Sequence, residues 1–412
     1  MPRVFPLLLI LGLVAAACGD GSTDVAGVEE ELALLVAAAE DVRGLTFVEE
    51  PEIAIVSSGE LADRIRRQLE EDLDPDETLV NQHLFELLGM LDGSVDLLQA
   101  INDFYSAAIA GYYDNDTGEM VISGDDALTP LVKTTVVHEL IHALTDQHFG
   151  FAAKLDALVE EKRHQEAAAI LALAEGDATY FHIVYMQSLP TSEQVEAVRE
   201  SLAFDTSVID SLPPWLAEDV TWPHTAGFAF VDRLVTDLGV SGLNQAYTLL
   251  PTTSEHIIHP GSYFTRQPSR PAVLPDVALD GYEVFEEGEW GEWNLELYLL
   301  DGVDPGEAIV AATGWGGDEY RIYWNGSDLA FVYLFVGDTP RDAEELATSL
   351  ARSVTERLAV GSETTADGTI LIPEEDFALI LRDEATVLFV AADDPLVGSN
   401  LASRLQTALA FE

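Results

Sequence analysis

The spacing of apolar residues divides the chain into a helical part, up to about residue 280, and a part in which apolar and polar residues alternate. In the first part, apolar positions three and four apart predict amphipathic helices over residues 28–48, 59–74 and 79–104, the last with a turn signal at Asp92-Gly93. Residues 52–56 alternate and predict a short strand between the first two helices.

A β-hairpin is predicted over residues 107–123. Ile109, Gly111 and Tyr113 alternate, residues 115–118 carry the turn signal Asn-Asp-Thr-Gly, and the strand pattern resumes at Met120. Such a hairpin either offers an edge strand to an extended peptide or serves packing alone.

The next segment, Val136–Asp146, reads Val-Val-His-Glu-Leu-Ile-His-Ala-Leu-Thr-Asp, and its apolar spacing predicts a helix that stops at Gly150. His138 and His142 are four residues apart and therefore lie on one face, where both can bind one Zn²⁺. Glu139 lies beside that face, where a general base takes a proton from a water on the metal. A match of this length also arises by chance, so the interpretation needs a third ligand.

Glu175 is the candidate third ligand. Residues 152–185 predict two helical runs, and Glu175 lies among alanine and leucine residues of the second, over 166–186. A carboxylate in such surroundings is costly to bury unless a cation compensates it. Gly176 weakens a helix and is expected where another helix approaches closely. The alternative is an exposed glutamate on a helix face.

Four more residues are candidates for supporting roles. Asp146 lies four residues after His142, on the same helix stripe as both histidines and near the helix C-terminus, where an anion is unfavourable. A hydrogen bond accepted from a ligand histidine would justify a carboxylate here, so we expect this role. Asp177 is the rival for this role, although it faces nearly away from the third ligand. His224, expected at the start of a helix over residues 225–238, and Tyr113 are rival donors to the oxyanion of a tetrahedral intermediate. Any of the four could instead be an ordinary solvated side chain.

From about Tyr282 the pattern changes to strands and two helices. Strands are predicted at residues 308–313, 319–324, 328–336, 368–372, 377–382 and 386–391, and helices at 340–359 and 396–409. No phosphate-binding loop or titratable cluster stands out here. We predict a separate α+β domain with a binding or structural role.

The first eighteen residues are predicted to be a leader. Arg3 precedes an apolar run from Val4 to Ala17, which is short for a membrane-spanning helix. The small residues before Cys18 resemble the lipobox of bacterial lipoproteins, in which the cysteine is lipidated. A plain cleaved signal peptide is the alternative. Residues 19–27 are predicted to be a flexible tether.

Composition narrows the function classes. The chain of 412 residues has 74 acidic and 19 basic residues, for a net charge of −55, so binding to nucleic acid or anionic lipid is disfavoured. This acidic surface suits solubility and could favour cationic substrates. The alternative is a solvated surface that indicates nothing about a binding partner. Cys18 is the only cysteine, so no internal disulfide forms and the fold depends on its core.

The two metal-ligand motifs together resemble a known family. HELIH followed about thirty residues later by Ala-Glu-Gly-Asp-Ala is similar to the gluzincin branch of the zincins, HExxH zinc metallopeptidases whose third ligand is a glutamate on a second helix. The resemblance is strongest to bacterial lipoprotein and secreted members with HELxHALxDQHF and EGDA, here His138–Phe149 and Glu175–Ala178. Two later stretches also resemble this group, without an assigned mechanism: Ser254–Pro260 and Ala311–Asp318.

The resemblance implies a Zn²⁺ site of His138, His142 and Glu175, with Glu139 as general base and the hairpin as a peptide-binding edge. We therefore predict an α+β fold, with a leader (1–18), a tether (19–27), a mainly helical zincin-like catalytic domain (28–280) and a C-terminal α+β domain (281–412). The predicted function is an extracytoplasmic zinc peptidase that acts on a peptide or protein substrate and meets the membrane only through its lipid anchor, or is secreted. The alternative is a non-catalytic envelope lipoprotein that retains the metal as a structural brace. Cleavage specificity and oligomeric state stay open.

Overall fold

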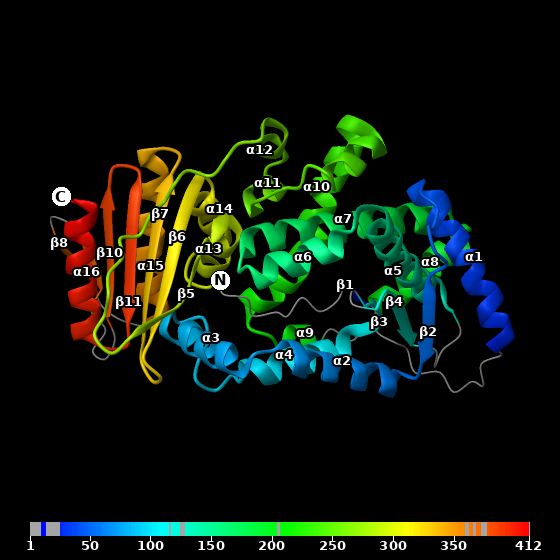
Figure 1. Cartoon of the computed structure of the whole chain (residues 1–412), viewed down its shortest axis with the longest axis horizontal. Helices are drawn as coiled ribbons and strands as arrows, with labels where there is room; N and C mark the ends of the chain where they lie inside the picture. The colour runs from blue at the N-terminus through cyan, green and yellow to red at the C-terminus, as the bar shows by residue number, and fades with distance from the viewer. Residues whose placement is uncertain are drawn as a thin grey trace.

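The computed structural model describes residues 10–13, 25–114, 117–123, 128–203, 207–358, 362–365, 368–371 and 377–411. Helices predominate in the first 280 residues, and a larger antiparallel sheet with covering helices follows, so the predicted α+β class is confirmed. In Figure 1 this sheet stands at one end of the molecule, and the helix with the HELIH motif lies toward the other.

The first elements are α1 (Val25–Arg43), β2 (Glu52–Val56), α2 (Ser58–Asp72), α3 (Pro75–Leu87) and α4 (Leu97–Ala108). Local caps explain where two of them begin: Ser57 accepts a hydrogen bond from the backbone N–H of Glu60, and Asp74 caps α3 ahead of Pro75. The predicted run over 79–104 consists of two helices, α3 and α4, and the turn signal at Asp92-Gly93 lies between them. Helix α1 starts at Val25, inside the predicted tether, while Cys18 and residues 19–24 lie outside the described residues.

A four-stranded sheet covers one side of the helical part, in the order β1-β3-β4-β2. Its new members are β1 (Ile10–Leu13), β3 (Ile109–Tyr113) and β4 (Glu119–Ser123). Strands β3 and β4 form the predicted hairpin, and β2 pairs with β4 in parallel. Strand β1 belongs to the predicted leader, yet it pairs antiparallel with β3. The outer edge of β3 is therefore paired with β1, and the hairpin strands lie inside the sheet rather than at the edge that the sequence predicted.

The helices around the motif are α5 (Pro130–Phe149), α6 (Phe151–Glu160), α7 (His164–Ser188), α8 (Thr191–Leu202), α9 (Ser207–Asp210), α10 (Pro214–Ala246), α11 (Ser254–Ile258) and α12 (Pro260–Thr265). Helix α5 begins at the Thr129 cap and Pro130, and it ends at Gly150, which has the left-handed φ of 57° that glycine tolerates. Both ends follow from local sequence.

Helix α10 corrects one sequence prediction. It continues through Pro223, so His224 lies well inside a long helix rather than at the start of one. A proline removes one backbone hydrogen bond, but Trp222 and Phe230 on either side are buried, and this burial holds the helix together.

Helices α7 and α10 touch backbone to backbone. A Cβ on Gly176 would overlap the carbonyl group of Gly227, and a Cβ on Gly227 would overlap the carbonyl oxygen of Ala172. The prediction that Gly176 admits a close neighbour is confirmed. This contact brings α10 next to the turn of α7 that carries Glu175.

The C-terminal elements are β5 (Glu283–Gly288), α13 (Gly291–Leu300), α14 (Pro305–Ala312), β6 (Trp315–Trp324), β7 (Leu329–Gly337), α15 (Pro340–Leu358), β8 (Ser362–Thr365), β9 (Gly368–Leu371), β10 (Phe377–Asp383), β11 (Thr386–Ala392) and α16 (Pro395–Leu409). The sheet order is β5-β6-β7-β11-β10-β9-β8. The predicted strand at 308–313 is wrong, because Asp304 caps a helix that has Pro305 in its first turn.

Both faces of this sheet are covered. On β7, Phe331, Tyr333 and Phe335 face the core that includes α15, whereas the alternate residues face the core that includes α16. Figure 1 shows α16 on the outer side of the sheet and α13 and α14 on the side toward the rest of the molecule. Helix α15 packs on the same face as α13 and α14.

One hydrophobic core crosses the predicted domain boundary at residue 280. Phe85 of α3 and Trp215 of α10 belong to the same buried cluster as Trp290 and Phe331. A second cluster joins α1, the helices around the motif and their small sheet, and Trp293 of α13 packs against it. The sheet and helices α3 and α4 therefore share a core, although they are distant in sequence.

The two later motifs meet at this junction. The buried Asp318 carboxylate accepts hydrogen bonds from the backbone N–H groups of Trp290 (2.8 Å) and Gly291 (2.9 Å) and from two side chains. The amide of Gln165, in the first turn of α7, donates to the carbonyl of Trp290 and accepts from Ser254. The motifs thus fasten the sheet to the start of α7, which is a structural role.

The glycine contact can be tested by substitution. We expect Gly176→Ala to lower the free energy of unfolding by about 2–3 kcal/mol, because the new methyl group forces α7 and α10 apart. Gly59→Ala is the matched control, since a Cβ on this helical glycine meets open space; it should be neutral or raise stability by up to about 1 kcal/mol. Urea denaturation measures the free energy of unfolding of both variants. Equal changes in the two variants would contradict the close contact between α7 and α10.

Candidate metal centre

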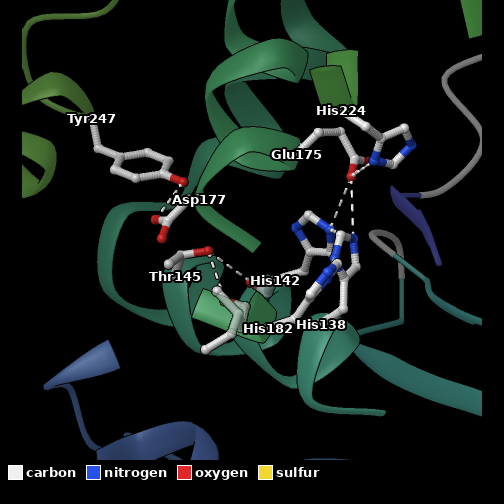
Figure 2. Close-up of polar contacts among 9 residues, drawn as sticks. His138, His142, Thr145, Glu175, Asp177, His182, His224 and Tyr247 are labelled. Atoms are coloured by element: carbon white, nitrogen blue, oxygen red, sulfur yellow. Dashed lines mark hydrogen bonds and ion pairs between the residues drawn. The ribbon is translucent and has the colours of Figure 1, made fainter. Parts of the chain in front are cut away.

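Helices α5 and α7 bring the three predicted ligands together. The Nε2 atoms of His138 and His142 lie 3.0 Å apart, and the Oε2 atom of Glu175 lies 3.2 Å from the first and 3.4 Å from the second. All three residues are buried. Figure 2 shows these side chains pointing toward one another from the two helices.

These separations match the donor set of a small divalent cation. A tetrahedral Zn²⁺ with bonds of about 2.0–2.1 Å holds neighbouring ligand atoms about 3.3–3.4 Å apart. The three donors are two imidazole nitrogens and one carboxylate oxygen, a combination that binds Zn²⁺ in other proteins. Three lone-pair atoms converge on one point in an apolar interior, where a cation offsets the burial of the carboxylate. The residues present therefore fit the metal.

The protonation states agree with metal binding. Burial lowers the pKa of His142 to about 4 and also lowers the pKa of His138, against the attraction of Glu175, so both imidazoles are neutral near pH 7. Burial alone would raise the pKa of Glu175, but the neighbouring His224 and His142 hold it well below its usual value. Two neutral nitrogens and one carboxylate leave a divalent ion with net positive charge.

His224 joins this group from α10. Its Nδ1 atom lies 3.0 Å from Oε2 of Glu175, and its ligand atom and those of His138 and Glu175 all lie within 4.8 Å of one another. Glu175 raises the pKa of His224 against the effect of burial. The ring can donate a hydrogen bond toward the centre or offer it a further nitrogen.

His182 is a partner that the sequence reasoning missed. Its Nδ1 atom lies 3.1 Å from Nδ1 of His138. A proton shared between these two atoms leaves Nε2 of His138 free as a donor to metal, since the hydrogen bond on one ring nitrogen sets the tautomer. His182 follows Glu175 by seven residues, which is two helical turns, so its position on the same face could have identified it.

Glu139, the predicted general base, is fully buried on α5 beside the first ligand. Its placement in the middle of the helix keeps its carboxylate away from bulk water.

The predicted roles of Asp146 and Tyr113 need correction. The Asp146 carboxylate accepts hydrogen bonds from the Tyr113 hydroxyl at 3.2 Å and from the backbone N–H of Ala152 at 3.0 Å. Nδ1 of His142, the expected donor, has no hydrogen-bond partner among the described residues. Asp146 instead caps the start of α6, where an anion is favourable, and it engages the hydroxyl that was expected to face the oxyanion.

Asp177 likewise supports the fold rather than a ligand. It forms a buried ion pair with Arg43 of α1 at 2.9 Å and accepts a hydrogen bond from the Tyr247 hydroxyl at 2.9 Å. Figure 2 shows it directed away from the ligand group, toward Tyr247. The reason is its position two residues after Glu175, on the opposite side of α7.

This ion pair gives a prediction about stability. Asp177→Asn should lower the free energy of unfolding by about 3–5 kcal/mol, because it leaves the buried guanidinium of Arg43 uncompensated. The double variant Arg43→Met with Asp177→Leu should recover most of the loss, since a buried pair can often be replaced by apolar side chains. Chemical denaturation measures both. A loss below about 1 kcal/mol in the single variant would contradict the pairing.

Helix α7 is also long and apolar enough, by length and composition, to cross a membrane, and it is the one such helix among the residues described. In the structure 61% of its apolar window is buried. It carries Glu175 within the protein core, as expected of a central helix.

Comparison with known proteins concerns only the C-terminal part. Residues 282–401 match a family described as a domain of unknown function, DUF8575. This segment runs from the start of the larger sheet into α16. The chain matches no curated protein and no solved structure.

Proposed function

We propose that this protein is a zinc-dependent peptidase. The observation that carries the proposal is the convergence of Nε2 of His138, Nε2 of His142 and Oε2 of Glu175 within 3.0–3.4 Å of one another. The resemblance of the two motifs to the gluzincins and the zincin-like order of hairpin and motif helix support it.

The ligands and the base divide the work as follows. His138, His142 and Glu175 would hold zinc, which when bound acts as a Lewis acid toward a peptide carbonyl and makes water more acidic. Glu139 takes the proton from the attacking water and delivers it to the nitrogen of the leaving amine. His224 donates a hydrogen bond to the oxygen on which negative charge develops.

In this proposal β3 supplies the substrate-binding edge once cleavage of the leader removes β1, which pairs with it in the structure. Strand β1 already pairs antiparallel with it from Ile10 to Leu13, which supports an edge that accepts an extended segment. A substrate bound in the same way would lie along the sheet beside α5. The backbone would give affinity without regard to sequence.

The leader pattern supports a location of the proposed activity outside the cytoplasm. Export with lipidation at Cys18 would anchor the protein to the outer face of a membrane, and the acidic surface would keep the rest of the chain in solution. A single cysteine agrees with a fold that needs no disulfide.

The general base can be tested directly. In zinc-loaded protein, Glu139→Gln should lower kcat for peptide hydrolysis by about 10²–10⁴-fold, because the amide cannot accept the proton, while bound zinc stays at one per chain. Glu292→Gln changes a buried glutamate of α13 and should leave hydrolysis unchanged. Undiminished cleavage by the Glu139 variant would exclude it as the base.

One observation favours the non-catalytic alternative. His224 lies close enough to Glu175 and His138 to act as a fourth protein ligand. A site closed by four protein ligands has no position for water or substrate and would be a structural brace.

The variant His224→Ala separates the two functions. The peptidase proposal expects zinc to be retained and kcat to fall by about 10²–10³-fold, as for the loss of an oxyanion donor. A structural site would instead lose zinc affinity by about tenfold or more together with thermal stability, because the metal binding energy is folding energy. Competition with a chelator and thermal unfolding of the same samples give the answer.

A further inference from the structure

A pocket of 430 Å³ opens beside the metal centre, between α5, α7, α8 and α10. His138, His182 and His224 form the side of the pocket that faces the centre. A group bound here therefore lies next to the proposed reacting bond. None of the described lining residues belongs to β3, so the pocket adds a separate determinant of what can bind.

The opposite wall of the pocket is apolar. Its hydrophobic residues come from three helices: Leu131, Met186, Ala197, Val198 and Leu202. The remaining described lining residues are threonines and one serine, and among the residues that the structure describes no aspartate, glutamate, lysine or arginine lines the pocket. Although the chain has 74 acidic residues, the described lining offers no carboxylate to a cationic side chain, whose burial would then be costly.

The apolar wall continues onto the surface of α8. Val195, Val198 and Leu202 are 63%, 49% and 83% exposed, and their spacing of three and four places them along one stripe of the helix. The last two also line the pocket. Exposed apolar residues that lead into a concave site mark a binding surface more often than scattered ones do.

We propose that this pocket binds an uncharged, apolar side chain of the peptide substrate, next to the scissile bond, and that the α8 stripe receives the apolar residue beyond it. This inference rests on the proposed peptidase function and names its substrate class. The surface charge alone suggests cationic peptides, but the site itself selects aliphatic or aromatic side chains.

The test compares Val198→Asp with Val195→Asp in the zinc-loaded full chain. Both positions are on the same exposed helix stripe, but only Val198 lines the pocket. The probes are sets of four peptides that differ only in having leucine, alanine, lysine or aspartate at one position. Each set varies a different position along the peptide. Hydrolysis is followed for each peptide, and binding is measured by calorimetry with the Glu139→Gln variant.

At one position of the peptide, we expect the leucine peptide to have a kcat/KM about 100-fold higher and a Kd about 100-fold lower than the aspartate peptide, because a hydrophobic pocket discriminates to this extent. Val198→Asp should weaken binding of the leucine peptide about tenfold and reduce the ratio of its affinity to that of the lysine peptide. Val195→Asp should change the affinity for the leucine peptide less than about twofold. Equal preference for all four side chains, or equal effects of the two variants, would overturn the inference. Preferential binding of the leucine peptide without hydrolysis would overturn the peptidase function and leave the pocket assignment standing.

Discussion

The burial of the Glu175 carboxylate is the constraint on which the rest of this structure depends. A carboxylate removed from water within an apolar helix needs compensation, and here it is surrounded by imidazoles from two other helices at 3.0–3.4 Å. The neutral imidazoles of His138 and His142 compensate it only in part, while His224, whose pKa it raises, adds positive charge on one side. A cation bound between these nitrogens and the carboxylate oxygen would compensate the remaining negative charge. The stability of the fold and the proposed chemistry therefore depend on the same group of side chains.

The framework keeps these groups close by two different means. On one side, paired glycines let α7 and α10 touch, which brings His224 to Glu175. On the other side, the ion pair of Arg43 and Asp177 fixes α7 against α1. At the start of α7, the hydrogen bonds of Gln165 fasten the helix to the junction with the C-terminal sheet. Helix α7 is thus held along its length, and Glu175 has little freedom to turn away.

This arrangement gives a role to the C-terminal part that does not require a site of its own. Its sheet shares a core with α3, α4 and the start of α10, so it supports the helices that carry the ligands. Asp318 organises the contact through four hydrogen bonds, which explains the Gly-Trp-Gly-Gly-Asp motif. The DUF8575 match falls on this supporting sheet, and the candidate metal centre lies outside it.

The sequence by itself determined most local elements and the three candidate ligands, which the structure brings together. Helical spacing, the Thr129 cap and the stop at Gly150 defined α5, and the apolar surroundings of Glu175 identified it before any contact was known. Local patterns failed where neighbours in space decide the outcome. His182 contacts His138 only because α5 and α7 pack together, and α10 passes through Pro223 because its flanking residues are buried. Asp146 and Asp177 found partners on α6 and α1 rather than on the ligands, since the tertiary structure decides which polar group lies within hydrogen-bond distance.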